Sequence, residues 1–165
     1  MSCRSLLAFA VALLLAACAT PLSLKPGTSI DEARAALGRP TAEMRLPDGG
    51  TRLQFSGQPN NQSVVNADFD AQGRLRVVEQ MMTDESFARV RAGKDTQADV
   101  LRDFGRPADI FHYRLSNETA FMYRYLTHGN FPAAMFIYFD PAGVVKRTET
   151  GLDPWSIRNG GNRND

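Results

Sequence analysis

The chain has 165 residues, of which 19 are basic and 18 acidic, and its formal net charge is +1 at pH 7. This balance, with no block of basic residues, excludes the electrostatic signature of a nucleic-acid-binding protein. The length is sufficient for a hydrophobic core that does not depend on disulfides.

The first 17 residues have the pattern of a secretory signal peptide. One positive charge, Arg4, precedes an uncharged apolar run over residues 6–17 that ends in small residues. A helix over this run would be about 18 Å long, which is short of the roughly 30 Å hydrocarbon core of a bilayer. The sequence therefore predicts a signal peptide over 1–17 and no permanent transmembrane helix. Cys3 lies within the signal, so Cys18 would have no disulfide partner in the mature chain.

Residues Leu15-Ala16-Ala17-Cys18 resemble the lipobox of bacterial lipoprotein precursors. In that family the signal is removed before the cysteine, whose thiol carries a diacylglycerol and whose amino group usually carries an acyl chain. The resemblance implies that Cys18 is the lipid attachment site, with a tether over 18–24. By analogy with enterobacterial sorting, Ala19 in place of aspartate indicates the outer membrane. Ala17-Cys18-Ala19 also fits ordinary signal cleavage, which would release a soluble protein, and this alternative stays open.

An internal repeat follows the tether. The first copy begins with KPGTSIDEARAALGRP (Lys25 to Pro40) and the second with RAGKDTQADVLRDFGRP (Arg91 to Pro107). Further along, the two copies share the matching segments ADFDAQGRL (Ala67 to Leu75) and IYFDPAGVV (Ile137 to Val145). Because both signatures recur in the same order, the sequence predicts two tandem domains over 25–82 and 83–152. A disordered polar tail is expected over 153–165.

Each copy is predicted to contain one helix and about three strands, followed after a turn by another extended segment. A capping box begins each helix, and a glycine in a left-handed cap ends it. These residues are Ser29, Glu32 and Gly38 in the first copy and Thr96, Asp99 and Gly105 in the second. A further short helix is expected around 86–91. The expected strands and extended segments are 43–46, 52–55, 64–70 and 74–80, then 110–115, 120–126, 134–140 and 144–150. The fold class is α+β: two tandem units, each a short helix (or helix pair) packed on one face of an antiparallel β-meander.

The helix, turn and strand motifs resemble the BamE (SmpA/OmlA) lipoprotein domain. The matching segments are Gly27-Thr28, Leu37 to Pro40 and Phe69 to Gly73, with Gly93, Phe104 to Pro107 and Phe139 to Gly143 in the second copy. BamE is an outer-membrane lipoprotein that supports the β-barrel assembly machinery, and it has one such unit. The two-copy arrangement is similar to the β-lactamase inhibitor protein, which binds an enzyme with the open face of its sheet. Such resemblances specify fold better than function.

The sequence contains no recognisable catalytic constellation. His112 and His128 have no nearby cysteine or carboxylate pattern that suggests a metal site. Asp70 and Asp140 stand in turn sequences, where carboxylates cap backbone amides. We therefore expect no enzyme activity, no metal and no cofactor beyond the covalent diacylglycerol and N-acyl chain on Cys18.

Comparison of equivalent strands in the two copies identifies a candidate protein-binding face in the second. Polar residues of the first copy are replaced there by side chains that protein interfaces favour. The candidate residues are His112, Met122, Arg124, Phe136 and Tyr138. Packing of this face against the first domain, the linker over 79–87 or the tail around Trp155 is an equally open alternative.

Together these features predict a membrane-anchored periplasmic lipoprotein that is not an enzyme. Its expected role is that of a scaffold or accessory subunit in outer-membrane β-barrel protein assembly or envelope maintenance, with envelope proteins as partners. The alternative is a protein inhibitor or regulator that covers an enzyme active site with its sheet face.

Overall fold

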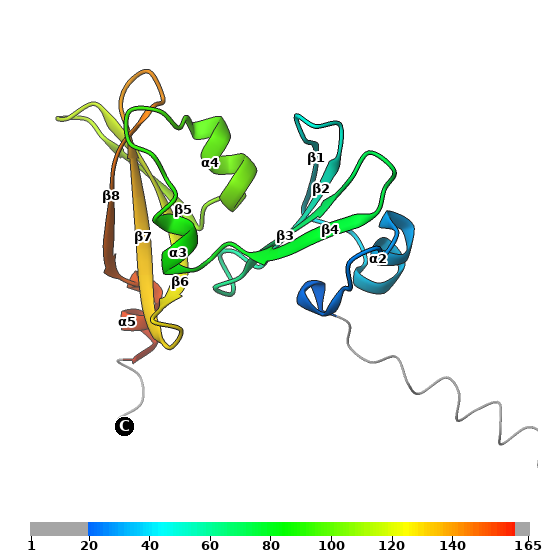
Figure 1. Cartoon of the computed structure of the whole chain (residues 1–165). Helices are drawn as coiled ribbons and strands as arrows, with labels where there is room; N and C mark the ends of the chain where they lie inside the picture. Colours follow the sequence, from blue (N-terminus) through cyan, green and yellow to red (C-terminus); the bar gives the residue numbers. More distant parts are fainter. Residues whose placement is uncertain (1–19, 161–165) are drawn as a thin grey trace, which may run out of the picture.

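The computed structural model describes residues 20–160 and contains two four-stranded antiparallel sheets joined by short helices (Figure 1). The first unit comprises η1 (Pro21–Ser23), α2 (Ile30–Leu37), β1 (Ala42–Arg45), β2 (Thr51–Ser56), β3 (Val64–Phe69) and β4 (Leu75–Gln80). The second comprises α3 (Asp84–Phe87), α4 (Gln97–Phe104), β5 (Asp109–Tyr113), β6 (Glu118–Thr127), β7 (Phe131–Phe139), β8 (Val145–Leu152) and α5 (Pro154–Gly160). The strands are ordered sequentially in each sheet, so the α+β class with two meanders is confirmed.

Both predicted capping boxes are present. The Ser29 and Thr96 side chains accept hydrogen bonds from the backbone N–H groups of Glu32 and Asp99, whose carboxylates bind back to the capping residues. These reciprocal bonds satisfy amides that a helix start otherwise leaves unpaired.

The glycines that end the two helices are required, but their conformation differs from the expected left-handed cap. Gly38 has φ +75° and ψ −155°, and Gly105 has φ +72° and ψ −165°. These angles lie in the region of positive φ and ψ near 180°, the mirror image of the extended β region, which only glycine occupies readily. The chain leaves each helix in this extended form toward Pro40 or Pro107, which cannot continue a helix.

Each unit has its own hydrophobic core on one face of its sheet. In the first unit Ala33 of α2 packs with Leu53, Ala67 and Phe69. The core of the second unit is larger and more aromatic. Its helices α3 and α4 meet through the stacked rings of Phe87 and Phe104, whose centroids are 4.8 Å apart.

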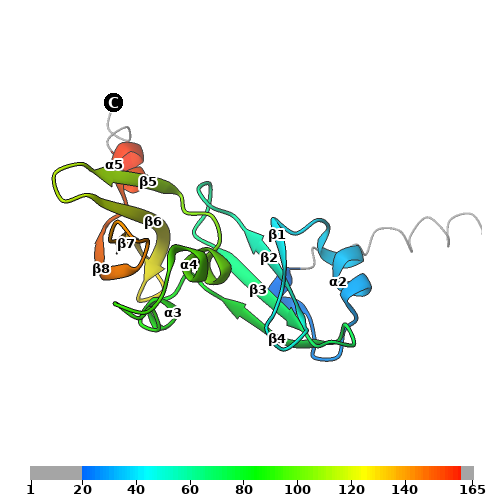
Figure 2. The same cartoon turned by 90° about the horizontal axis from the view of Figure 1, so that it is seen from above.

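The helix α4 lies between the two sheets (Figure 1 and Figure 2). One side of α4 covers its own sheet through Val100 and Phe104. Its C-terminal end contacts the first sheet on the face opposite α2, where the Arg102 and Asp103 carbonyls accept side-chain hydrogen bonds. Val64 of β3 joins the core of the second unit. The two units therefore share a packed boundary.

The expectation of a disordered polar tail over 153–165 is wrong for the first residues of that range. Asp153 is fully buried, and residues 154–160 form α5. The Asp153 carboxylate accepts a hydrogen bond from the Trp155 N–H, and Pro154 occupies the first helical position, an arrangement that favours helix initiation. The fold thus continues past the last strand.

The expected tether over 18–24 is wrong for residues 21–24, which are part of the first unit. Pro21–Ser23 form the 3₁₀ helix η1, and Leu24 packs against the core of the first unit. Cys18 and the predicted signal peptide lie outside the described residues. Across residues 20–160, none of the helices combines the length and the apolar character needed to cross a bilayer.

Replacing Gly105 by alanine tests the shared boundary, and Gly38→Ala is its matched control. Both changes place a Cβ in a glycine-only backbone region, which costs about 1–3 kcal/mol. A Cβ on Gly105 would also lie 2.7 Å from the Gln54 side-chain oxygen, whereas a Cβ on Gly38 has no neighbour within 4 Å. We expect Gly105→Ala to lower the free energy of unfolding by about 1 kcal/mol more than Gly38→Ala in urea denaturation, because the Gln54 hydrogen bonds must shift. Equal losses would contradict the shared boundary.

Candidate functional site

The five residues of the predicted binding face do not share one surface. His112 of β5 is in register with Thr119, which is in register with Phe139. Phe139 belongs to the core under the helices, so His112 lies on the helix side of the sheet. Phe136 and Tyr138, which alternate with Phe139, point to the opposite side. The expectation that groups His112 with the other four is therefore wrong, because the strand register places it on the other face.

The remaining four residues are largely covered by the chain itself. Met122 is buried. The Arg124 guanidinium is paired with Asp153 at 2.8 Å and lies 4.9 Å from the centre of the Trp155 ring. It also donates to the Pro59 carbonyl of the first unit. The tail and a loop of the first unit thus occupy this part of the face.

The aromatic part of the same face is packed within the second sheet. Phe136 is half-buried beside Phe111, and a Cβ on Gly151 would lie 3.2 Å from its ring. Tyr138 is buried and lies beneath the Arg147 guanidinium, 3.7 Å from the ring centre. Burial raises the pKa of Tyr138 to about 12, and hydrogen bonding with Glu149 adds to this shift. Phe136 and Tyr138 thus contact side chains of their own sheet, whereas the packing against the first domain and the tail that the sequence left open is found at Arg124.

The face of the first sheet opposite α2 carries a row of polar side chains instead. Arg52 of β2 donates two hydrogen bonds to Asp68 of β3, at 2.6 and 2.8 Å. The Gln54 side-chain amide donates to the Asn66 side-chain oxygen at 2.9 Å, and Asn66 donates to the Asp103 carbonyl at 2.9 Å. These side chains are buried or half-buried because the end of α4 lies on them.

Arg52 connects the two units. Its guanidinium binds Asp68 on one side and the Asp103 carboxylate of α4, at 3.0 Å, on the other. The Arg52 side chain is only 14% exposed. The hydrogen bonds to Asp68 raise the pKa of Arg52, which burial opposes. This arrangement keeps a cation between two carboxylates at the boundary.

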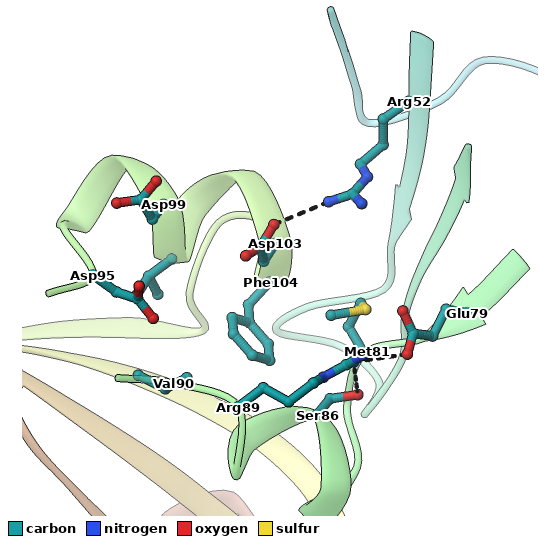
Figure 3. Close-up of a pocket in the computed structure, with 11 residues that line it drawn as sticks. Arg52, Glu79, Met81, Ser86, Arg89, Val90, Asp95, Asp99, Asp103 and Phe104 are labelled. Carbon is teal, nitrogen blue, oxygen red and sulfur yellow. Dashed lines mark hydrogen bonds and ion pairs between the residues drawn. The ribbon is translucent and has the colours of Figure 1, made fainter. Parts of the chain in front are cut away.

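Beside Arg52 lies a pocket of about 240 Å³ between the first sheet and helices α3 and α4, which we call the inter-unit groove (Figure 3). It is lined by Arg52, Glu79, Met81, Ser86, Arg89, Val90, Asp95, Asp99, Val100, Asp103 and Phe104. Figure 3 shows the carboxylates of α4 along one wall and Glu79 with Arg89 along the other. Sequence reasoning did not identify this groove, because its residues come from both units.

The charged groups of the groove are bound to one another. Glu79 and Arg89 form an ion pair at 2.7 Å. The hydrogen bonds from Thr96, together with Arg102, lower the pKa of Asp99 to about 2. Burial tends to raise the pKa of Asp95, but the hydrogen bonds from Arg91 lower it overall. These aspartates are therefore ionised at neutral pH, and the groove is lined by side chains of both charges.

Both histidines lie outside the residues that line the groove. His112 is hydrogen-bonded to the Thr119 hydroxyl at 3.2 Å, and His128 occupies the turn between β6 and β7 with φ +48°. Within the described part of the chain, no group of three or more His, Cys, Asp or Glu side chains is placed to hold a metal ion.

Arg52 of the groove also belongs to a partly apolar row that crosses the first sheet. Strand register places Met44, Arg52, Asp68 and Val77 in one row across the four strands. Met44 is half-buried and Val77 is exposed, so the two apolar side chains flank the central ion pair. We call this row the open-face strip. Of these residue types, Met and Arg are enriched in protein interfaces.

Neither a protein-family model nor a curated protein matches this chain. Two solved structures are similar to it. A DUF4309 family protein (YjgB) from Bacillus subtilis is 9% identical, with a TM-score of 0.32 and coverage of 76% of this chain and 79% of that chain. A proposed β-lactamase inhibitor protein from Streptococcus mutans is 14% identical, with a TM-score of 0.32 and coverage of 80% of this chain and 87% of that chain. At these identities and scores, neither structure assigns a partner or an activity to this chain.

Arg52→Ala tests whether the cation at the boundary holds the units together. The change leaves Asp68 and Asp103 without their shared cation, and removing one partner of a buried ion pair costs about 3–5 kcal/mol. The exposed ion pair of Arg34 with Glu43, at 2.7 Å, provides the control. In chemical denaturation we expect a loss near that range for Arg52→Ala and less than about 1 kcal/mol for Arg34→Ala. Similar losses in both variants would show that Arg52 has no special structural role.

Proposed function

We propose that this chain is a lipoprotein of the outer membrane, anchored through a diacylglycerol and an N-acyl chain on Cys18 and facing the periplasm. It is not an enzyme in this proposal. It binds an envelope protein as a scaffold or accessory subunit in outer-membrane β-barrel protein assembly or envelope maintenance. The lipobox resemblance at Leu15 to Cys18 supports the anchor.

The open-face strip is the observation that carries the binding role. It places exposed Val77 and half-buried Met44 on either side of the Arg52–Asp68 ion pair, next to the inter-unit groove. A partner strand or helix that covers this strip would bury apolar surface and meet alternating charges in the groove. The same surface would serve an inhibitor that covers an enzyme active site, so the identity of the partner distinguishes the two functions.

Cys18→Ser tests the anchor. Serine cannot form the thioether, so we expect loss of acyl labelling and release of the protein from the membrane fraction. Cys3→Ser, which changes the only other cysteine, is the control and should leave labelling unchanged. Continued labelling of the Cys18→Ser variant would rule out the proposed attachment site.

Crosslinked affinity purification of the lipidated protein tests the binding role. We expect envelope proteins, including barrel-assembly subunits, to be recovered, whereas a single hydrolase would instead support the inhibitor. Val77→Asp should lower recovery about tenfold, which corresponds to about 1.4 kcal/mol of binding free energy. Leu115→Asp, on the exposed turn between β5 and β6, is the matched control. Equal recovery with both variants would exclude the open-face strip as the binding surface.

A further inference from the structure

Four large apolar side chains are exposed in elements that lie along one edge of the molecule. Leu22 in η1 is 56% exposed, Phe131 at the start of β7 is 67%, Leu152 at the end of β8 is 74%, and Ile157 in α5 is 60%. In Figure 1, η1, the turn between β6 and β7, and α5 all lie along the lower side of the molecule. Exposed apolar residues scattered singly are ordinary, but a group on one edge of two different units indicates a contact surface.

Local geometry explains why these side chains face outward. Leu24 enters the core of the first unit, and Leu22 of the single-turn helix η1 is left exposed. In the second unit Leu152 is in register with Ala133, two positions from Phe131, so Leu152 and Phe131 are on the same side of the sheet. The first residue of α3, Asp84, reaches the β6–β7 hairpin through Thr127 and His128 but leaves Phe131 and Leu152 exposed, and α5 begins two residues after Leu152.

The position of the lipid attachment site indicates what covers this edge. Cys18 precedes Leu22 by four residues. An extended chain covers at most about 3.6 Å per residue, so the acylated cysteine would lie within about 14 Å of Leu22. A lipid on Cys18 would therefore bring η1 to the bilayer surface, and the same edge carries the exposed residues of the second unit.

We propose that Leu22, Phe131, Leu152 and Ile157 form a membrane-contact edge that inserts shallowly at the boundary between lipid headgroups and acyl chains. This inference rests on the proposed lipid anchor at Cys18. The anchor by itself fixes one point of the protein and leaves it free to rotate. Contact by the second unit fixes its orientation and directs the turns β1–β2 and β5–β6, at the upper side of Figure 1, away from the bilayer.

The charges near this edge are mixed in sign. Lys25 and Glu85 are exposed, whereas Asp84 accepts hydrogen bonds from the Thr127 hydroxyl and the His128 N–H at the end of the β6–β7 hairpin. The His128 N–H holds the pKa of Asp84 below its usual value. Since no single sign of charge dominates, we attribute the contact to apolar insertion and expect little dependence on salt.

The only tryptophan of the chain, Trp155, lies in α5 and reports on the contact. Residues 18–165, which include every described residue, are coupled through Cys18 to a maleimide lipid in phosphatidylethanolamine–phosphatidylglycerol vesicles. The vesicles carry bromine atoms near the upper end of the acyl chains, and quenching of Trp155 fluorescence is measured. Because the lipid is attached chemically, the result does not depend on acylation in cells. A negative result here would therefore contradict the membrane-contact edge alone, and a negative Cys18→Ser result would contradict the lipid anchor alone.

We expect the unmodified sequence to be quenched at low and high salt. The double variant Phe131→Ser with Ile157→Ser should reduce quenching at least about twofold, because apolar burial drives interfacial insertion. Leu115→Ser, fully exposed at the opposite end of the second sheet, is the matched control and should have no effect. Absence of quenching in the unmodified sequence, or equal quenching in the double variant and the unmodified sequence, would overturn the proposal. An equal reduction in the Leu115→Ser control would overturn it as well.

Discussion

The guanidinium of Arg52 holds the two halves of this protein in one arrangement. It binds Asp68 of its own sheet and Asp103 of α4 in the second unit, and little of it is exposed to water. A half-buried arginine needs compensating carboxylates, and here the two carboxylates belong to different units. Around it, Gln54 and Asn66 bind the last carbonyls of α4, which satisfies groups that a helix end leaves unpaired. Arg52 also lines the inter-unit groove and belongs to the open-face strip.

The second unit covers its outer face by different means. Asp153, directly after β8, pairs with Arg124, and α5 follows immediately. Part of the face that would otherwise be free for a partner is occupied by the chain's own C-terminal segment. The equivalent faces of the two sheets therefore make different contacts. The first sheet contacts α4 through a row of polar side chains, and the second sheet is partly covered by Asp153 and α5. This divergence is the reason that the open surface next to the groove belongs to the first unit.

The proposed binding surface and the proposed membrane-contact edge are compatible in one orientation. The exposed apolar residues of the edge lie in η1, β7, β8 and α5, whereas the open-face strip runs across β1 to β4. A short connection to Cys18 and a second contact near α5 would hold the protein close to the bilayer. A partner on the open-face strip would then meet a surface with a defined direction relative to the membrane. The physical basis is simple, since one flexible anchor gives proximity and two contacts also give orientation.

The sequence by itself determined the local structure of this protein. The repeat, the capping boxes and the turn glycines predicted two α+β units and nearly all their strands, because these signals act between residues close together in the chain. Tertiary structure decided what each face contacts. The register of β5 moved His112 to the helix side, Asp153 and α5 covered Arg124, and Asp103 came to Arg52 from 51 positions away. No local pattern specifies such pairings, because burial and charge compensation depend on which distant segments meet once both units have folded.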